Sequence, residues 1–96
     1  MTLHILSGAE SEYAEALLYY FGESPQAAGG FIEAIDAGFA EILDHPMMYR
    51  IHVGTVRVKN IDVYPFCIYY RIKEEEIEVV SISHNSRKPE HWLDRL

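Results

Sequence analysis

The stretch Phe66–His84 decides the fold, and it reads FCIYYRIKEEEIEVVSISH. In its first half, Phe66, Ile68, Tyr70 and Ile72 share one parity, as expected for a strand with one face toward a core, and Cys67, Tyr69, Arg71 and Lys73 have the other. A second apolar run extends from Ile77 to Ser83, and Glu74–Glu76 between the two runs is typical of a solvated hairpin turn. The stretch therefore predicts two hairpin-connected strands.

A shorter alternating run, Val56–Lys59, predicts one more strand before this pair. We expect helices to cover the sheet face that carries Val56, Val58, Ile68, Tyr70 and Ile72. The opposite face would then present Arg57, Lys59, Tyr69, Arg71 and Lys73.

The N-terminal half has helical periodicity instead. One apolar stripe has members at positions i, i+3, i+4, i+7 and i+8: Tyr13, Ala16, Leu17, Tyr20 and Phe21. Ser7 and Glu10 have the spacing of a capping box, and Gly22 is a plausible left-handed cap. These signals predict a first helix that starts at Ser7 and ends at Gly22.

A second helix follows, because Ser24-Pro25 is a typical start and Asp44-His45-Pro46 a typical end. Its apolar stripe comprises Ala28, Phe31, Ile32, Ile35, Phe39, Ile42 and Leu43. Gly29, Gly30 and Gly38 weaken this helix. Either the helix is closely approached at these glycines, or its first turn is loose.

Leu3–Leu6 is a short apolar run that can join the sheet as a first strand. The expected order is β-α-α-β-β-β, an α+β fold with a helical hairpin on one face of a mainly antiparallel sheet. Residues 1–96 are expected to form one domain.

Charge is unevenly distributed along the chain. Residues 1–49 contain eight acids and no Lys or Arg, whereas residues 50–96 contain eight bases and seven acids, which gives −8 and +1 and a net charge of −7. An acidic chain argues against non-specific nucleic-acid binding. Any anion site must therefore lie in the C-terminal half.

Other classes of protein are disfavoured. The N-terminus lacks the features of a signal peptide, and no apolar run is long enough to span a membrane. The lone Cys67 is expected to be a buried hydrophobic residue in a reducing cytoplasm. The five histidines have no metal-binding spacing, so we expect neither a metal nor a cofactor.

Candidate binding residues lie on the predicted open sheet face. Arg57, Lys59, Tyr69 and Arg71 combine groups that can pair phosphates, stack on bases or accept an acidic peptide. The same residues also fit an ordinary solvated sheet face.

The C-terminal segment adds His84, Arg87 and Trp92. His84 and Arg87 could serve phosphodiester cleavage, as acid or base and as phosphate ligand, or could make structural contacts at a strand end. Trp92 fits a hydrophobic peg that pins the C-terminal segment, with an anchor in a partner interface as the alternative.

Several motifs in this order resemble the RelE/ParE family of toxins from type II toxin-antitoxin modules. They are Val56-Arg57-Val58, the strand from Tyr64-Pro65-Phe66 to Tyr70, the strand Ile77–His84, and His84-x-x-Arg87-x-Pro89-x-x-Trp92. The resemblance implies a small α+β toxin, cytoplasmic, held inactive by a cognate antitoxin in a hetero-oligomer.

The last motif is typical of ParE-like members, which block DNA gyrase, so the resemblance implies a gyrase inhibitor. The alternative is a RelE-like endoribonuclease that cuts messenger RNA on the ribosome. In that case His84 would transfer protons, Arg57 and Arg87 would hold the phosphate, and Tyr69 would stack on a base. A third alternative is a degenerate, non-toxic family member.

The acidic helices bear on how an antitoxin binds. They predict apolar or basic antitoxin residues over the helical half, with acidic antitoxin residues meeting Arg57, Lys59 and Arg71.

Overall fold

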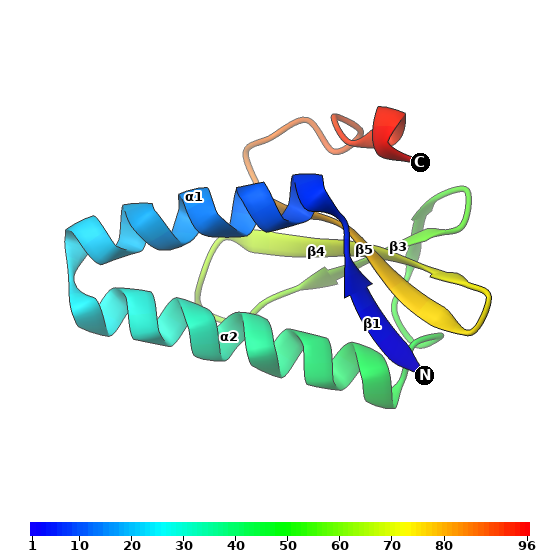
Figure 1. Cartoon of the computed structure of the whole chain (residues 1–96), viewed down its shortest axis with the longest axis horizontal. Helices are drawn as coiled ribbons and strands as arrows, with labels where there is room; N and C mark the ends of the chain where they lie inside the picture. Colours follow the sequence, from blue (N-terminus) through cyan, green and yellow to red (C-terminus); the bar gives the residue numbers. More distant parts are fainter.

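Two antiparallel helices lie across one face of a mixed sheet in the computed structural model, which describes all residues from Met1 to Leu96 (Figure 1). The elements are β1 (Thr2–Ile5), α1 (Ser7–Glu23), α2 (Pro25–Asp44), β2 (Ile51–Val53), β3 (Val56–Asn60), β4 (Phe66–Lys73), β5 (Glu76–His84) and a 3-10 turn (Leu93–Arg95). The predicted α+β class and element order are confirmed, and β2 is an additional short strand.

The sheet has five strands in the order β1-β5-β4-β3-β2. β4 and β5 form the predicted antiparallel hairpin, from Phe66 opposite His84 to Lys73 opposite Glu76. Its turn is made by Glu74 and Glu75, whose φ angles of 51° and 62° are those of a two-residue hairpin loop. β1 joins the other edge of β5 in parallel, with Leu3 opposite Ile77.

The helix limits differ in part from the prediction. Ser24 begins α2 as expected, because its Oγ accepts a hydrogen bond from the Ala27 amide at 3.0 Å. At α1 the prediction of a capping box was wrong, because Leu6 is the N-cap residue and makes no side-chain cap bond. Gly22 was also wrong as a cap, because α1 continues to Glu23 and the chain then extends at Ser24.

Close approach explains two of the three glycines in α2. A Cβ atom on Gly30 would overlap the Tyr64 hydroxyl, and one on Gly38 would lie 2.9 Å from Ile68 Cδ1. Gly29 faces open space. Helix α2 can therefore press onto the Tyr64 loop and onto β4 because Gly30 and Gly38 have no side chain.

Each face of the sheet carries a hydrophobic core. The larger core lies between helices and sheet and includes Phe31, Ile35 and Ile42 of α2 with Ile68 and Tyr70 of β4. The smaller core lies on the other face, and its buried residues are Val56, Val58, Cys67, Tyr69, Val80 and Trp92.

The predicted facing of β3 was therefore wrong. Val56 and Val58 pack with Tyr69 on the face away from the helices, whereas Lys59 pairs with Glu41 of α2 at 2.8 Å. The reason lies in the register, in which Val58 is opposite Tyr69 and Arg57 is opposite Tyr70. Alternation within β3 predicts two faces but does not say which of them meets the helices.

Candidate functional site: two grooves beside helix α1

The sequence-predicted basic residues are engaged within the molecule. Arg57 Nη1 donates hydrogen bonds to the carbonyl oxygens of Met47 and Tyr49, at 3.1 and 2.7 Å. The ion pair of Lys59 with Glu41 lowers the pKa of that carboxyl group, chiefly through the hydrogen bond from Lys59. Arg71 pairs with Glu78 across β4 and β5, at 2.7 Å. These side chains stabilise the fold and do not form an open basic surface.

Tyr69 and Trp92 lie together in the smaller core, with ring centroids 5.0 Å apart. Trp92 is fully buried, as the peg interpretation predicts, and its indole lies near the His52 ring as well, tilted against it. Burial raises the pKa of the Tyr69 hydroxyl. The C-terminal segment thus covers the sheet face that the sequence predicted to be open.

His84 and Arg87 line one hollow of about 210 Å³ beside α1, together with Glu12, Glu15, Ala16, Phe66, Ile82 and Ser83. His84 Nδ1 accepts hydrogen bonds from the backbone amide and hydroxyl of Ser86, at 3.0 and 2.8 Å. Its ring packs on Phe66, with centroids 5.2 Å apart. The structure therefore brings His84 and Arg87 to one surface, apart from Tyr69 on the other face of the sheet.

A second hollow of about 390 Å³ adjoins the first and shares Ala16, Phe66 and His84 with it. Tyr19, Tyr20 and Pro65 complete its lining. The two hollows form one groove, which we call the His84 groove. It is aromatic at the end near Tyr19 and charged at the end near Glu15 and Arg87.

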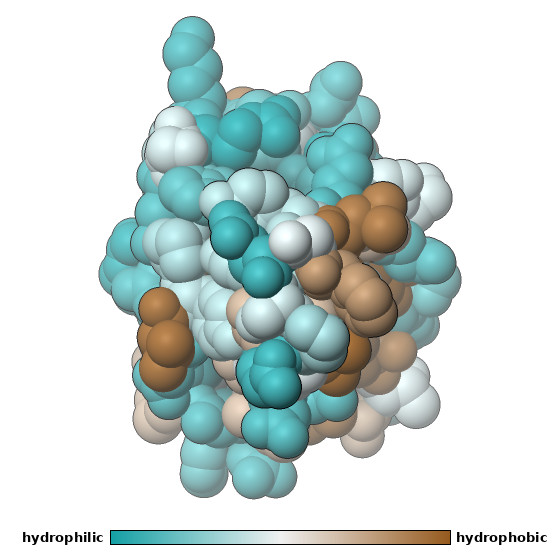
Figure 2. Space-filling view, turned by 90° about the vertical axis from the view of Figure 1, so that its left-hand side faces the viewer, coloured by the Kyte–Doolittle hydropathy of each residue, from teal (hydrophilic) through white to brown (hydrophobic).

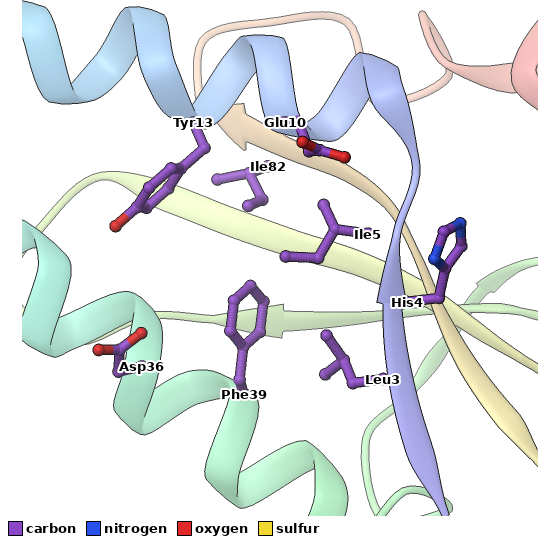
Figure 3. A pocket seen from close by; sticks show the side chains of 8 residues that line it. All are labelled: Leu3, His4, Ile5, Glu10, Tyr13, Asp36, Phe39 and Ile82. Carbon is purple, nitrogen blue, oxygen red and sulfur yellow. The ribbon is translucent and has the colours of Figure 1, made fainter.

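The other flank of α1 borders a larger cavity of about 530 Å³, which we call the β1 groove (Figure 3). Its apolar lining comes from β1, both helices and β5: Leu3, Ile5, Tyr13, Phe39 and Ile82. Glu10 and Asp36 stand on its rim, and the Tyr13 hydroxyl points toward α2 (Figure 3). Burial, together with the Asp36 charge, raises the pKa of Tyr13.

Helix α1 separates the two grooves. At about 100° per residue, Glu10 and Tyr13 project from one flank, and Glu12, Glu15 and Tyr19 project from the other. The two surfaces are thus accessible from different directions.

Several residues of the grooves were not predicted from the sequence as site residues. Tyr19 lines the His84 groove and is 64% exposed. Outside the grooves, Leu18 is 74% exposed, and Phe21, expected in the core stripe, is 63% exposed. The available signal was that α1 carries more large apolar residues than one buried stripe can hold. Figure 2 shows that hydrophobic side chains gather along one side of the end of the molecule where the helices turn.

No cluster of three or more potential metal ligands occurs in the structure. Neither helix has the length and apolar character needed to cross a membrane.

The helical hairpin on a mixed five-stranded sheet is the α+β fold that the resemblance to small toxins of type II toxin-antitoxin modules implies. The model of the family described as "ParE toxin of type II toxin-antitoxin system, parDE" matches residues 3–89. The chain belongs to this ParE toxin family.

A solved structure described as "Chromosomal ParDE TA system from P. aeruginosa" has the same fold. It superposes with a TM-score of 0.64 at 17% sequence identity, over 88% of this chain and 95% of that one. A search of curated proteins found no match.

Proposed function

We propose that this ParE-family toxin arrests growth by binding and inhibiting DNA gyrase in the cytoplasm, and that a cognate antitoxin neutralises it in a hetero-oligomer. The engagement of Arg57 is the main observation that supports binding over RNA cleavage. Its guanidinium group is held by the Met47 and Tyr49 carbonyl oxygens, so it is not free to hold a phosphate.

The other residues to which the RNase hypothesis assigns a role do not lie together. Tyr69 lies under Trp92 on one sheet face, and His84 packs against Phe66 on the helix side. A base-stacking group and a proton-transfer group must reach the same nucleotide, and these two side chains are separated by the sheet. This arrangement supports an inhibitor that acts by binding.

The β1 groove is the surface that we assign to the antitoxin. Its apolar lining and its rim of Glu10 and Asp36 suit an amphipathic segment with a basic residue at each edge. The N-terminal half has no lysine or arginine that would compete for these acids. Because Arg57, Lys59 and Arg71 are internally paired, acidic antitoxin residues would meet the exposed Arg50, Lys73 and Lys88 instead.

Induced expression in cells tests the proposed function. Plasmid supercoiling and transcript integrity are measured in the same arrested culture, with and without the antitoxin gene. We expect relaxed plasmids or DNA breaks, intact transcripts, and recovery with the antitoxin. Cleaved transcripts with normal supercoiling would support the RelE-like alternative, and absence of arrest would support a degenerate toxin.

Charge reversal on the groove rim tests the antitoxin assignment. Asp36→Lys should weaken antitoxin binding by about tenfold, because it places a like charge against the basic edge of the partner. Glu33→Lys makes the same charge change at another exposed position of α2 and should leave the affinity unchanged. Equal affinities for the two variants in calorimetry would place the antitoxin elsewhere.

A further inference from the structure

The His84 groove has walls that are fixed by the fold. Tyr64 holds the loop before β4 to α2 through a hydrogen bond from its hydroxyl to the Ala27 carbonyl oxygen, at 2.8 Å. Tyr20 packs edge-on against Tyr64, and the Asn85 amide donates to the Pro65 carbonyl oxygen at 2.8 Å. A groove that is formed before a partner arrives loses little entropy on binding.

Its chemistry changes along its length. Tyr19 and Pro65 offer an exposed aromatic and apolar surface with His84 beside them. At the other end the exposed Glu15 makes no ion pair or hydrogen bond, whereas the neighbouring Glu12 is bound by Arg95. The groove can therefore take a large apolar side chain at one end and a cation beside Glu15.

The loop that borders the aromatic end holds a strained and exposed residue. Val63 has a φ angle of 73° and is 95% exposed, two residues before Pro65. A β-branched residue in the left-handed region is costly, and such residues concentrate at functional sites. This apolar side chain is presented to solvent in the loop that leads to Pro65.

We propose that the His84 groove is the target-docking surface of the toxin, and this inference rests on the proposed function. It receives an extended protein segment that places an aromatic or long aliphatic side chain between Tyr19 and Pro65 and a lysine or arginine beside Glu15. Charge favours such a partner, because DNA-binding enzymes carry basic surfaces and residues 1–49 carry eight acids and no lysine or arginine.

This assignment gives the two flanks of α1 to two partners. The antitoxin occupies the β1 groove and the target occupies the His84 groove. Substitutions in the His84 groove should therefore reduce toxicity without reducing antitoxin binding.

The test compares Tyr19→Ser and Glu15→Lys with two controls, Leu18→Ser and Glu33→Lys. Leu18 neighbours Tyr19 on α1 and is exposed but does not line the groove, and Glu33 is an exposed acid of α2. Each toxin is purified from its antitoxin complex and titrated into a gyrase supercoiling assay, and antitoxin affinity is measured by calorimetry.

We expect about a tenfold or greater rise in the half-inhibitory concentration for Tyr19→Ser and Glu15→Lys, with antitoxin affinity and both controls unchanged. If Tyr19→Ser loses structure by circular dichroism, Glu15→Lys decides the result. Full inhibition by both groove variants would overturn the docking surface and leave the proposed function intact. If the wild-type protein does not inhibit supercoiling, the proposed function is overturned. Growth arrest in cells then decides the docking surface: it is rejected if both groove variants still arrest growth, or if the wild-type protein does not arrest growth.

Discussion

Arg95 Nη1 lies 2.7 Å from Glu12 Oε1, so the last turn of the chain is tied to the first helix across 83 positions of sequence. The same carboxylate oxygen accepts hydrogen bonds from Ser81 Oγ at 2.9 Å and from the Ile82 amide at 3.1 Å. These bonds give a hydrogen-bond partner to donors in the part of β5 that extends past its neighbour β1. Glu12 thus joins α1, the sheet edge and the C-terminal segment that covers Tyr69.

Removal of this carboxylate should destabilise the protein. We expect Glu12→Ala to lower the free energy of unfolding by about 2–3 kcal/mol, because Arg95 and the Ile82 amide lose their partner in a mostly buried site. Urea denaturation measures the change. Glu15→Ala, one turn from Glu12 on the exposed surface, should change the free energy by less than about 0.5 kcal/mol. Similar losses for the two variants would contradict this role of Glu12.

The two serines that begin the helices differ in a testable way. Ser24→Ala should cost about 1 kcal/mol of stability, because the Ala27 amide loses the hydrogen bond that it donates to Ser24 Oγ. Ser7→Ala should be close to neutral, since Ser7 lies inside α1 and makes no cap bond. Thermal unfolding of the two single variants checks this difference. An equal loss of stability for Ser7→Ala would show that Ser7 does take part in a capping box.

Adjacent glycines of α2 should respond in opposite directions to alanine. Gly29→Ala faces open space and should stabilise the protein by up to about 1 kcal/mol, through helix propensity. Gly30→Ala should destabilise it by about 1–3 kcal/mol, because the new methyl group displaces the Tyr64 hydroxyl from the Ala27 carbonyl oxygen. Stabilisation by both substitutions would show that α2 and the Tyr64 loop do not approach closely.

His91 should make stability depend on pH near neutrality. Burial and the nearby Arg87 lower its pKa from the ordinary value of 6.5, despite the opposing charge of Glu12. The unfolded chain therefore binds more protons than the folded protein below that pH, so stability is full above about 6.5 and falls as the pH falls toward the lowered pKa.

His91→Gln removes this titration and keeps a polar group beside Ser83, whose hydroxyl lies 2.9 Å from His91 Nε2. Denaturant midpoints at pH 8, 7, 6 and 5.5 should fall more steeply for the wild type than for the variant. Parallel curves would exclude His91 as the source of the pH dependence of stability, because the other histidines are present in both proteins.

Much of the fold could be predicted from local sequence signals. The alternation in Phe66–His84 and the Ser24-Pro25 start of α2 depend on neighbouring residues alone, and the structure confirms both. The facing of Val56–Lys59 was wrong because it depends on pairing with β4, which no local pattern encodes.

The candidate site was harder to predict, because partners distant in sequence decide which side chains are free. Arg57 is one of the predicted binding residues, but the Met47 and Tyr49 carbonyl oxygens hold it. Tyr19 carries no signal of a site in the sequence, and the structure places it in one groove with Pro65 and His84. The peg interpretation of Trp92 agrees with its full burial, because its type and segment already suggested a core contact.

We propose that this toxin acts on gyrase by binding. The most direct measurement titrates purified wild-type toxin into a gyrase supercoiling reaction and repeats the titration with one equivalent of antitoxin. We predict that the toxin alone inhibits supercoiling in proportion to its concentration and that the antitoxin restores it. Unchanged supercoiling at every toxin concentration, from a preparation that still arrests cells, would show that gyrase is not the target of this toxin.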